Sequence, residues 1–240
     1  MITSRDNEKL KLVRKLRNRR WREREGLFVS DGEDLLAAGL EAGRSPVDVL
    51  VAAGSGIAGA EVEPRLLDAA SALGSGSRAI AIWEIPTAPA GEPPRVYLDG
   101  VSDPGNVGTV IRTAAALTGA RVALGPGCAD PYSPKAVRSS MGAVLARPPA
   151  RAAFAATPAP RLGLVAHGGA DLDAAIAELA VEPTLCLGAE RSGLPGEVVH
   201  GCDATATIPL RGPAESLNVA AAAAIALQRI SSLAVAGVGD

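Results

Sequence analysis

Three loops in the second half of the chain each follow a short apolar segment and combine glycine with polar side chains. They cover residues 99–112, 188–195 and 208–218. Glycine lets the backbone turn sharply and approach a ligand closely. Amides, carboxylates, hydroxyls and a guanidinium can orient a substrate, bind an anion or assist a proton transfer. The candidate residues for this chemistry are Asn106, Arg112, Glu190, Ser216 and Asn218.

Arg112 lies within a predicted helix over residues 106–117, next to Val110, Ile111 and several alanines. We expect its guanidinium to be buried there, and a buried charge needs an anionic partner. A phosphate or carboxylate ligand is favoured over a purely structural arginine. Asn106 is expected to cap the start of this helix.

The elements that carry these loops alternate between apolar strands and helices. This pattern indicates an α/β fold with a mostly parallel sheet covered on both faces, and ligands of such sheets bind beyond the carboxyl ends of the strands. The predicted strands are 95–99, 121–124, 161–166, 184–188 and 205–210, and the predicted helices are 106–117, 134–145, 172–180, 195–200 and 215–235.

A second, smaller α/β domain is expected at the N-terminus, over residues 1–85. Residues 86–94 contain four prolines and no apolar periodicity, so they are predicted to form a stiff linker. The larger domain then covers residues 95–240.

The charge of the chain is divided unevenly. The 24 basic and 26 acidic residues give a net charge of −2, yet residues 1–25 hold ten basic and four acidic side chains. Residues 7–25 have helical apolar spacing, so a basic helix is predicted there. We interpret it as a phosphate-binding face, with a solvated surface helix as the alternative. Its candidate RNA-binding residues are Lys11, Arg14, Lys15, Arg17, Arg19 and Arg20.

Composition argues against several other classes of protein. Three cysteines without a CxxC pair, and two histidines, argue against a disulfide framework and a metal site. Six aromatic residues are too few for a base-stacking platform. Neither a spanning apolar segment nor a secretory leader is recognisable, so we expect a cytoplasmic protein without a membrane partner.

Residues 54–59 match the dinucleotide pattern G-x-G-x-x-G. Such a motif needs a helix that opens on the glycines, whereas here Pro64 begins the next predicted helix. We therefore predict a flexible loop and treat a dinucleotide-dependent oxidoreductase as a distant alternative.

Taken together, the three loops resemble those of the SpoU (TrmH-like) RNA ribose 2′-O-methyltransferases of the SPOUT superfamily. The similar patterns are D-x-x-x-D-P-x-N-x-G-x-x-x-R-T-A from Asp99 to Ala114, G-x-E-x-x-G-L from Gly188 to Leu194, and I-P-x-x-G-x-x-x-S-L-N-V from Ile208 to Val219. Their order and approximate spacing agree with the family over residues 99–229.

The resemblance implies S-adenosylmethionine as methyl donor, a C-terminal trefoil knot and a homodimer, with no metal. It places Leu187, Gly188, Ile208, Leu217 and Asn218 at the cofactor. Arg112 is implied to be catalytic, with Asn106, Glu190, Ser216 and Asn218 orienting it and the ribose. Because a guanidinium stays protonated, we interpret Arg112 as a phosphate clamp that stabilises the developing alkoxide, rather than as a base.

The N-terminal domain is similar to the RNA-binding domain of the same family, and the segment 131–142, with Lys135 and Arg138, also resembles a family segment. The implied partner is structured RNA, and ribosomal RNA of the 23S type is favoured over transfer RNA. A non-catalytic RNA-binding protein with this fold is the remaining alternative.

Overall fold

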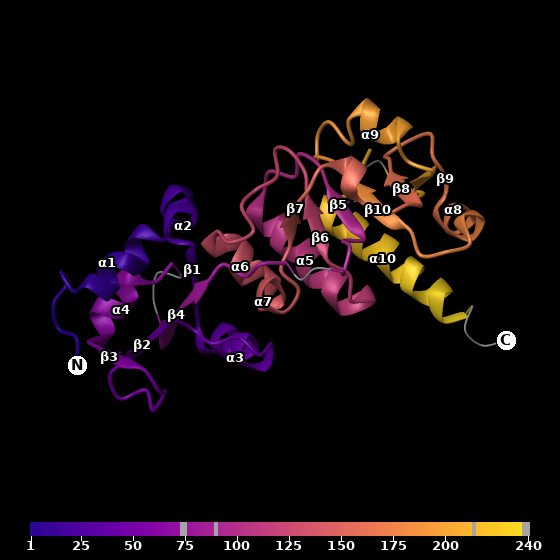
Figure 1. The fold of residues 1–240 in the computed structure, drawn as a ribbon. Coiled ribbons are helices and arrows are strands. Elements are labelled where there is room, and N and C mark those ends of the chain that lie inside the picture. The colour runs from indigo at the N-terminus through magenta and orange to yellow at the C-terminus, as the bar shows by residue number, and fades with distance from the viewer. Residues whose placement is uncertain (73–75, 89–90, 213–214, 237–240) are drawn as a thin grey trace. The chain divides into compact units, whose positions relative to one another are not determined.

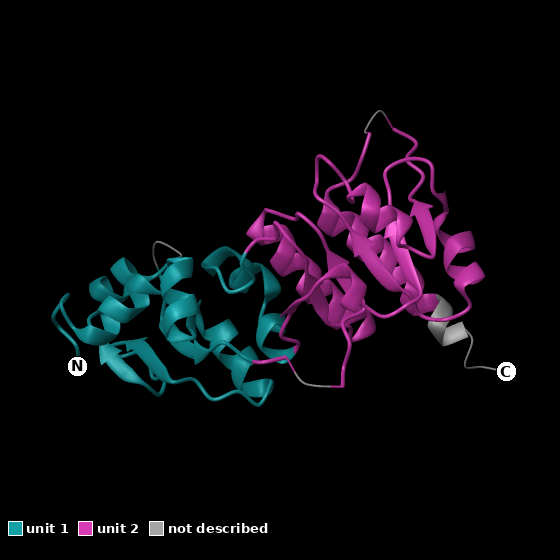
Figure 2. Ribbon diagram, turned by 45° about the horizontal axis from the view of Figure 1, so that its top comes forward, with its two compact units in different colours: residues 1–86, 130–146 teal, residues 87–129, 147–240 magenta. Residues whose placement is uncertain are grey.

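The computed structural model describes residues 1–72, 76–88, 91–212 and 215–236, and it divides the chain into two compact units (Figure 2). Unit 1 comprises Met1–Pro86 and Asp130–Ala146, and unit 2 comprises Thr87–Ala129 and Arg147–Asp240. Residues 130–146, which the sequence boundaries assign to the larger domain, therefore pack within unit 1.

Unit 1 is built on a four-stranded sheet with the order β1-β4-β2-β3. β4 runs antiparallel to both of its neighbours, and β2 and β3 are parallel. Its strands are β1 (Leu27–Asp31), β2 (Asp48–Ala52), β3 (Ala60–Val62) and β4 (Ala79–Glu84). Its helices are α1 (Glu8–Lys15), α2 (Arg19–Glu25), α3 (Glu33–Glu41), α4 (Pro64–Ala70), α6 (Pro134–Ser140) and α7 (Ala143–Ala146).

β4 is the central strand of unit 1 and is buried on both faces. Ala79, Ala81 and Trp83 contribute to one hydrophobic cluster, while Ile80 and Ile82 contribute to another. Because successive side chains of a strand point to opposite faces, one strand can supply both cores. Leu10 and Val13 of α1 belong to the same cluster as Ile80 and Ile82, so this helix forms part of the core.

The single basic helix predicted over residues 7–25 is wrong, because the chain forms two helices there. α1 ends at Lys15 with Leu16 as its C-cap, and Asn18 caps α2 by accepting a hydrogen bond from the Arg20 backbone N–H at 2.9 Å. An asparagine cap starts a new helix, since its side chain satisfies an amide that has no intrahelical partner.

The predicted helix over 134–145 is likewise two helices. Met141 and Gly142 both adopt positive φ angles, 48° and 88°, which ends α6 before α7 begins. A Cβ at Gly142 would collide with Ala38 of α3, so glycine is required for this close approach.

Unit 2 contains a seven-stranded sheet with the order β7-β6-β5-β10-β8-β11-β9, and all its neighbouring pairs are parallel (Figure 1). This confirms the predicted α/β fold; the trefoil knot stays a prediction. The strands are β5 (Val96–Leu98), β6 (Val122–Leu124), β7 (Ala150–Arg151), β8 (Arg161–Leu164), β9 (Ala170–Asp171), β10 (Thr184–Leu187) and β11 (Ala204–Thr207). The helices are α5 (Pro104–Thr118), η1 (Phe154–Ala156, a 3-10 turn), α8 (Leu172–Leu179), α9 (Gly196–His200) and α10 (Val219–Ala236).

The cap of α5 and the first residue of α10 differ from the expected ones. Asp103, rather than Asn106, caps α5, and its carboxylate accepts from the Asn106 backbone N–H at 3.0 Å. Asn218 does not lie inside the last helix, which begins at Val219. It precedes that helix, and its side-chain oxygen accepts from the Ala220 backbone N–H at 2.9 Å. α5 and α10 pack against each other (Figure 1).

Residues 54–59 form turns and irregular chain, so the predicted loop is confirmed and a helix does not open on these glycines. Gly54 and Gly56 both have a φ of 76°. Among the described residues, the structure contains no helix with the length and hydropathy required to cross a membrane.

Candidate active site

The second and third loops meet at one edge of the unit 2 sheet. β10, β8 and β11 are adjacent and parallel, so the loops that follow them leave the sheet at the same edge. A cavity of about 310 Å³ lies among these loops. The predicted residues that line it are Leu187, Gly188, Glu190, Ile208, Ser216 and Leu217.

A chain of side-chain hydrogen bonds joins all three loops. Asn218 donates from Nδ2 to Oδ1 of Asn106 at 3.1 Å, and Asn106 donates from Nδ2 to Oε1 of Glu190 at 2.7 Å. Because Asn218 also caps α10, its oxygen is fixed by backbone amides and its amide must face Asn106. The three residues therefore hold one another in defined orientations.

The loop after β10 is tightly folded around Gly188. Ala189 and Gly193 exchange two backbone hydrogen bonds, of 3.1 and 2.9 Å, which bring the loop back on itself. A Cβ at Gly188 would overlap the backbone of Gly193 and Leu194. Glycine at position 188 is therefore a packing requirement, and it leaves backbone groups at the cavity wall uncovered by a side chain.

Asp99, the first residue of the first loop, has a positioning contact within unit 2. Its Oδ2 accepts a hydrogen bond from the Tyr97 hydroxyl at 2.7 Å. Burial, together with this carboxylate, raises the pKa of Tyr97 well above its usual value. Tyr97 thus stays protonated at neutral pH and donates a hydrogen bond from β5 to the residue that follows the strand.

The expectation that Arg112 is buried is wrong. Val110, Ile111 and Ala114 form the buried stripe of α5, while Arg112 falls outside it and is exposed. Within the described ranges, Arg112 has no hydrogen bond or ion pair, and it does not line the cavity. The helical period places it on the outer face, six residues and about 1.7 turns along α5 from Asn106.

Several residues that line the cavity were not predicted from the sequence. The segment 164–167, which includes His167, enters from β8, and Arg191 and Leu210 come from the other two loops. The sheet order puts β8 between β10 and β11, and this adjacency cannot be read from the chain order. Residues 164–166 fall at the end of the strand predicted over 161–166, and the position of His167 directly after it is the one signal that could have indicated this segment.

The predicted RNA-binding residues of unit 1 are exposed or partly exposed, and most make local contacts. Lys11 pairs with Glu8 at 3.0 Å, and Arg19 pairs with Glu23 at 2.7 Å. The ammonium of Lys15 lies 4.9 Å from the ring centre of Trp21. Arg14 donates to the Arg5 carbonyl, Arg17 donates to the carbonyls of Ala70 and Ser71, Arg138 pairs with Asp34, and Arg20 and Lys135 are exposed.

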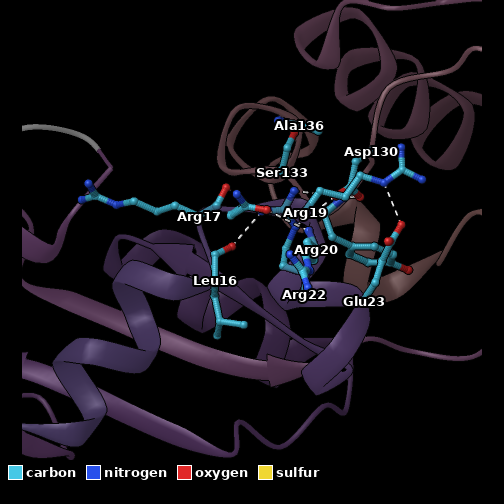
Figure 3. Close-up of polar contacts among 11 residues, drawn as sticks. Leu16, Arg17, Arg19, Arg20, Arg22, Glu23, Asp130, Ser133 and Ala136 are labelled. Atoms are coloured by element: carbon cyan, nitrogen blue, oxygen red, sulfur yellow. Dashed lines mark hydrogen bonds and ion pairs between the residues drawn. The ribbon is translucent and has the colours of Figure 1, made fainter.

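One arginine of the basic run is structural. Arg22 is 3% exposed and donates to Oδ2 of Asp130 through Nη2 at 2.5 Å and Nε at 3.0 Å (Figure 3). Its Nη1 donates to the carbonyls of Leu16 and Arg17 at 2.7 and 2.8 Å. This side chain joins α2 to the end of α1 and to the segment 130–146. Its charge is therefore paired inside unit 1.

The described part of the chain contains no group of three or more histidine, cysteine, aspartate or glutamate side chains arranged to hold a metal ion.

The sequence matches the family model of the SpoU rRNA Methylase family over residues 93–228. An uncharacterised tRNA/rRNA methyltransferase of Mycobacterium tuberculosis is 41% identical over 54% of this chain and 48% of its own length, so the chain spans about half the length of that relative. The 23S rRNA (guanosine(2553)-2′-O)-methyltransferase RlmP of Bacillus subtilis is 31% identical over 93% of this chain and 96% of its own.

The same likeness extends to solved structures. The SpoU methyltransferase AviRb of Streptomyces viridochromogenes, solved in complex with the cofactor AdoMet, superposes with a TM-score of 0.82 at 27% identity and covers 95% of this chain and 98% of its own. The motifs, the fold and the family match agree, and the chain belongs to the SpoU rRNA methylase family.

Proposed function

We propose that this protein transfers a methyl group from S-adenosylmethionine to the 2′-hydroxyl of a ribose in structured ribosomal RNA of the 23S type. The observation that carries the proposal is the hydrogen-bonded set of Asn218, Asn106 and Glu190 beside the glycine-built cavity, in a chain of this family. The name of the Bacillus subtilis relative supports the RNA substrate, and the AdoMet complex of AviRb supports the cofactor.

The cavity residues fit S-adenosylmethionine. A volume of about 310 Å³ is at the lower end of the range for small-molecule sites. Leu187, Ile208 and Leu217 offer apolar walls, and the bare backbone at Gly188 offers hydrogen-bonding groups for an adenine or an amino-acid moiety. When bound, the cofactor supplies an electrophilic methyl group on a sulfonium sulfur.

The side chains of the site prepare the ribose. Asn106 is held on one side by Asn218 and on the other by Glu190, so its amide does not have to reorganise when the substrate arrives. Such fixed polar groups align a nucleophile and reduce the entropic cost of reaction. We assign Ser216, at the cavity, and Asn218 to the same orienting role.

Arg112 serves as the cation for the RNA. Its exposure, and the lack of a bound partner in the described structure, leave its five donors available to a phosphate. Because Arg112 lies outside the cavity and its guanidinium remains protonated, we assign it to an RNA phosphate beside the reacting ribose, where its charge stabilises the negative charge that develops on the ribose oxygen. The hydroxyl proton passes to solvent water and not to Arg112.

Unit 1 grips the RNA backbone through its exposed cations. Lys15, Arg19, Arg20 and Lys135 present charge to solvent, and most of affinity for nucleic acid comes from such phosphate contacts. An RNA substrate of this kind supports a cytoplasmic location.

A homodimer belongs to the same proposal. α5 and α10 pack together and expose Leu117 and Ile225, which are 37% and 41% accessible. Apolar side chains on two adjacent helices suit a second copy of the chain. Sedimentation should give a dimer at micromolar concentration, and a monomer there would count against it.

Calorimetry and single-turnover methyl transfer test the proposal together. Binding of S-adenosylmethionine is expected for the wild type, and Arg112→Ala should retain it while losing about 100-fold or more in methyl-transfer rate. Arg112→Lys should recover only part of this rate, because an ammonium lacks the planar fork of donors. Arg65→Ala, at an exposed arginine of α4, is the charge-matched control.

The remaining alternatives are outcomes of the same assay. Methyl transfer to tRNA in preference to rRNA would favour the hypothesis of a tRNA substrate. The name of the Mycobacterium tuberculosis relative includes both tRNA and rRNA. RNA binding without cofactor binding would indicate a non-catalytic protein with this fold. Wild-type transfer rates in Arg112→Ala would remove Arg112 from the mechanism.

A further inference from the structure

Unit 1 contains a pocket that the proposed chemistry does not use. Its volume is about 380 Å³, and every residue that lines it belongs to unit 1. The walls come from α1, β1, α3, β4 and α6, through Val13, Val29, Leu35, Ile80 and Val137. These walls are aliphatic, so the interior favours an apolar, flat or compact group over water.

Three cations stand among the lining residues of this apolar pocket. Arg17 lies just after α1, and Lys135 and Arg138 lie on α6, where Arg138 also pairs with Asp34 at 2.8 Å. Arg17 is anchored by the carbonyls of Ala70 and Ser71, and its side chain extends away from the buried Arg22 cluster (Figure 3). The guanidinium is thereby held in place while its remaining donors stay available.

One acidic residue, Asp31, lines the pocket, and neutral donors bind its carboxylate. Asp31 accepts hydrogen bonds from the Ser71 hydroxyl at 2.7 Å, from the Ala72 backbone N–H at 2.7 Å and from the Ser77 hydroxyl. These neutral donors fix the position of the carboxylate and leave its charge, so the lining sets three cations against one carboxylate. The pocket therefore combines an apolar interior with a positive lining, which complements an anion that carries an apolar body.

We propose that this pocket binds one unpaired nucleotide of the RNA, with the base inside and its flanking phosphates on Arg17, Lys135 and Arg138. The proposal rests on the proposed function, because it takes the partner of unit 1 to be RNA. The pocket has the volume for a base with its sugar, and the cations come from separate segments, as a backbone that passes across a pocket requires. Unpaired bases are the parts of folded RNA that can leave the stack and enter such a site.

The first test is methyl NMR on the full chain with labelled valine and leucine. The probes are the four nucleoside 5′-monophosphates, added in the presence of S-adenosylmethionine. Methyl groups of Val13, Val29, Leu35 and Val137 should shift and saturate in the millimolar range. Inorganic phosphate alone should leave them in place. Absence of a saturable shift at these methyl groups for all four nucleotides would overturn the proposal.

The second test fills the pocket. Ala72 is exposed and lines it, and only its backbone N–H is used by Asp31, so Ala72→Trp should fold and occupy the space. We expect the KM for rRNA to rise roughly tenfold with kcat unchanged, because the pocket contributes to substrate binding alone. Ala37→Trp, at an exposed alanine of α3 outside the pocket, is the matched control and should keep the wild-type KM.

The two proposals fail separately. NMR shifts at the valine and leucine methyl groups of the pocket, without any methyl transfer to RNA, would support nucleotide binding in the pocket and contradict the proposed function. Methylated rRNA, with unmoved wall methyl groups and an unchanged KM in Ala72→Trp, would leave the function standing and remove the pocket.

Discussion

Replacement of Arg22 tests whether this arginine of the basic segment 7–25 stabilises the fold or binds RNA. Arg22→Ala removes a guanidinium that is 3% exposed and leaves Asp130, 15% exposed, without its partner. It also removes the donor from the carbonyls of Leu16 and Arg17. The variant therefore strands one charge and two carbonyl groups in the interior of unit 1.

The cost can be estimated from these contacts. Removing one member of a buried ion pair costs about 3–5 kcal/mol. The two carbonyl bonds would add about 1.5–3 kcal/mol each if they were independent, but groups that share one guanidinium are not additive. Partial exposure of Asp130 allows water to recover part of the loss. We expect the free energy of unfolding of unit 1 to fall by about 3–5 kcal/mol.

Urea denaturation followed by tryptophan fluorescence measures this loss. The protein has two tryptophans, Trp21 and Trp83, and both belong to unit 1, so the signal reports on that unit. Arg20→Ala is the matched control because Arg20 lies two residues away and is exposed. It should change stability by less than about 0.5 kcal/mol.

RNA binding should show the opposite pattern. Arg20→Ala should reduce the slope of log K against log salt by about 0.7–0.9, the contribution of one phosphate contact. Folded Arg22→Ala should retain the wild-type slope. A stability loss below about 1 kcal/mol in Arg22→Ala, or a reduced salt slope in that variant, would refute the structural assignment.

Three further outcomes are expected. Gly188→Ala should abolish binding of S-adenosylmethionine in calorimetry, because the new Cβ overlaps the backbone of Gly193; unchanged affinity would show that the loop can yield. Asn106→Ala should lower kcat about 10- to 100-fold in a methyl-transfer assay with little change in cofactor affinity, and an equal loss in both would assign it to binding. Cys202 should react first with iodoacetamide near pH 8, as judged by peptide mass spectrometry, because the interaction between the neighbouring thiols lowers the pKa of Cys202 and raises the pKa of Cys186; faster alkylation of Cys186 would contradict this.

The alternation of strands and helices could be predicted from the sequence because burial imposes a local pattern. Apolar runs such as Thr184–Leu187 are buried at every position, and glycine marks the loops where the backbone bends. The three loops could be identified for the same reason, since their polar residues directly follow such runs.

Features that depend on packing between distant segments could not be predicted. Arg22 looks like every other arginine of the basic run, and only the position of Asp130, far along the chain, makes it a core residue. The face of α5 that carries Arg112 is set by the buried stripe of that helix. Arg112 was predicted to be buried because its sequence neighbours are apolar, but it lies on a different face from them. The place of β8 between β10 and β11 likewise depends on the sheet order.

Methylation of the ribose oxygen can be measured by alkaline hydrolysis. Unmodified 23S rRNA is incubated with the full chain and S-adenosylmethionine carrying a labelled methyl group, then hydrolysed. A 2′-O-methyl group removes the hydroxyl that cleaves the adjacent phosphodiester, so the label should appear in an alkali-resistant dinucleotide. Label released in mononucleotides, which indicates a methylated base, or no transfer despite bound cofactor, would contradict the proposed function.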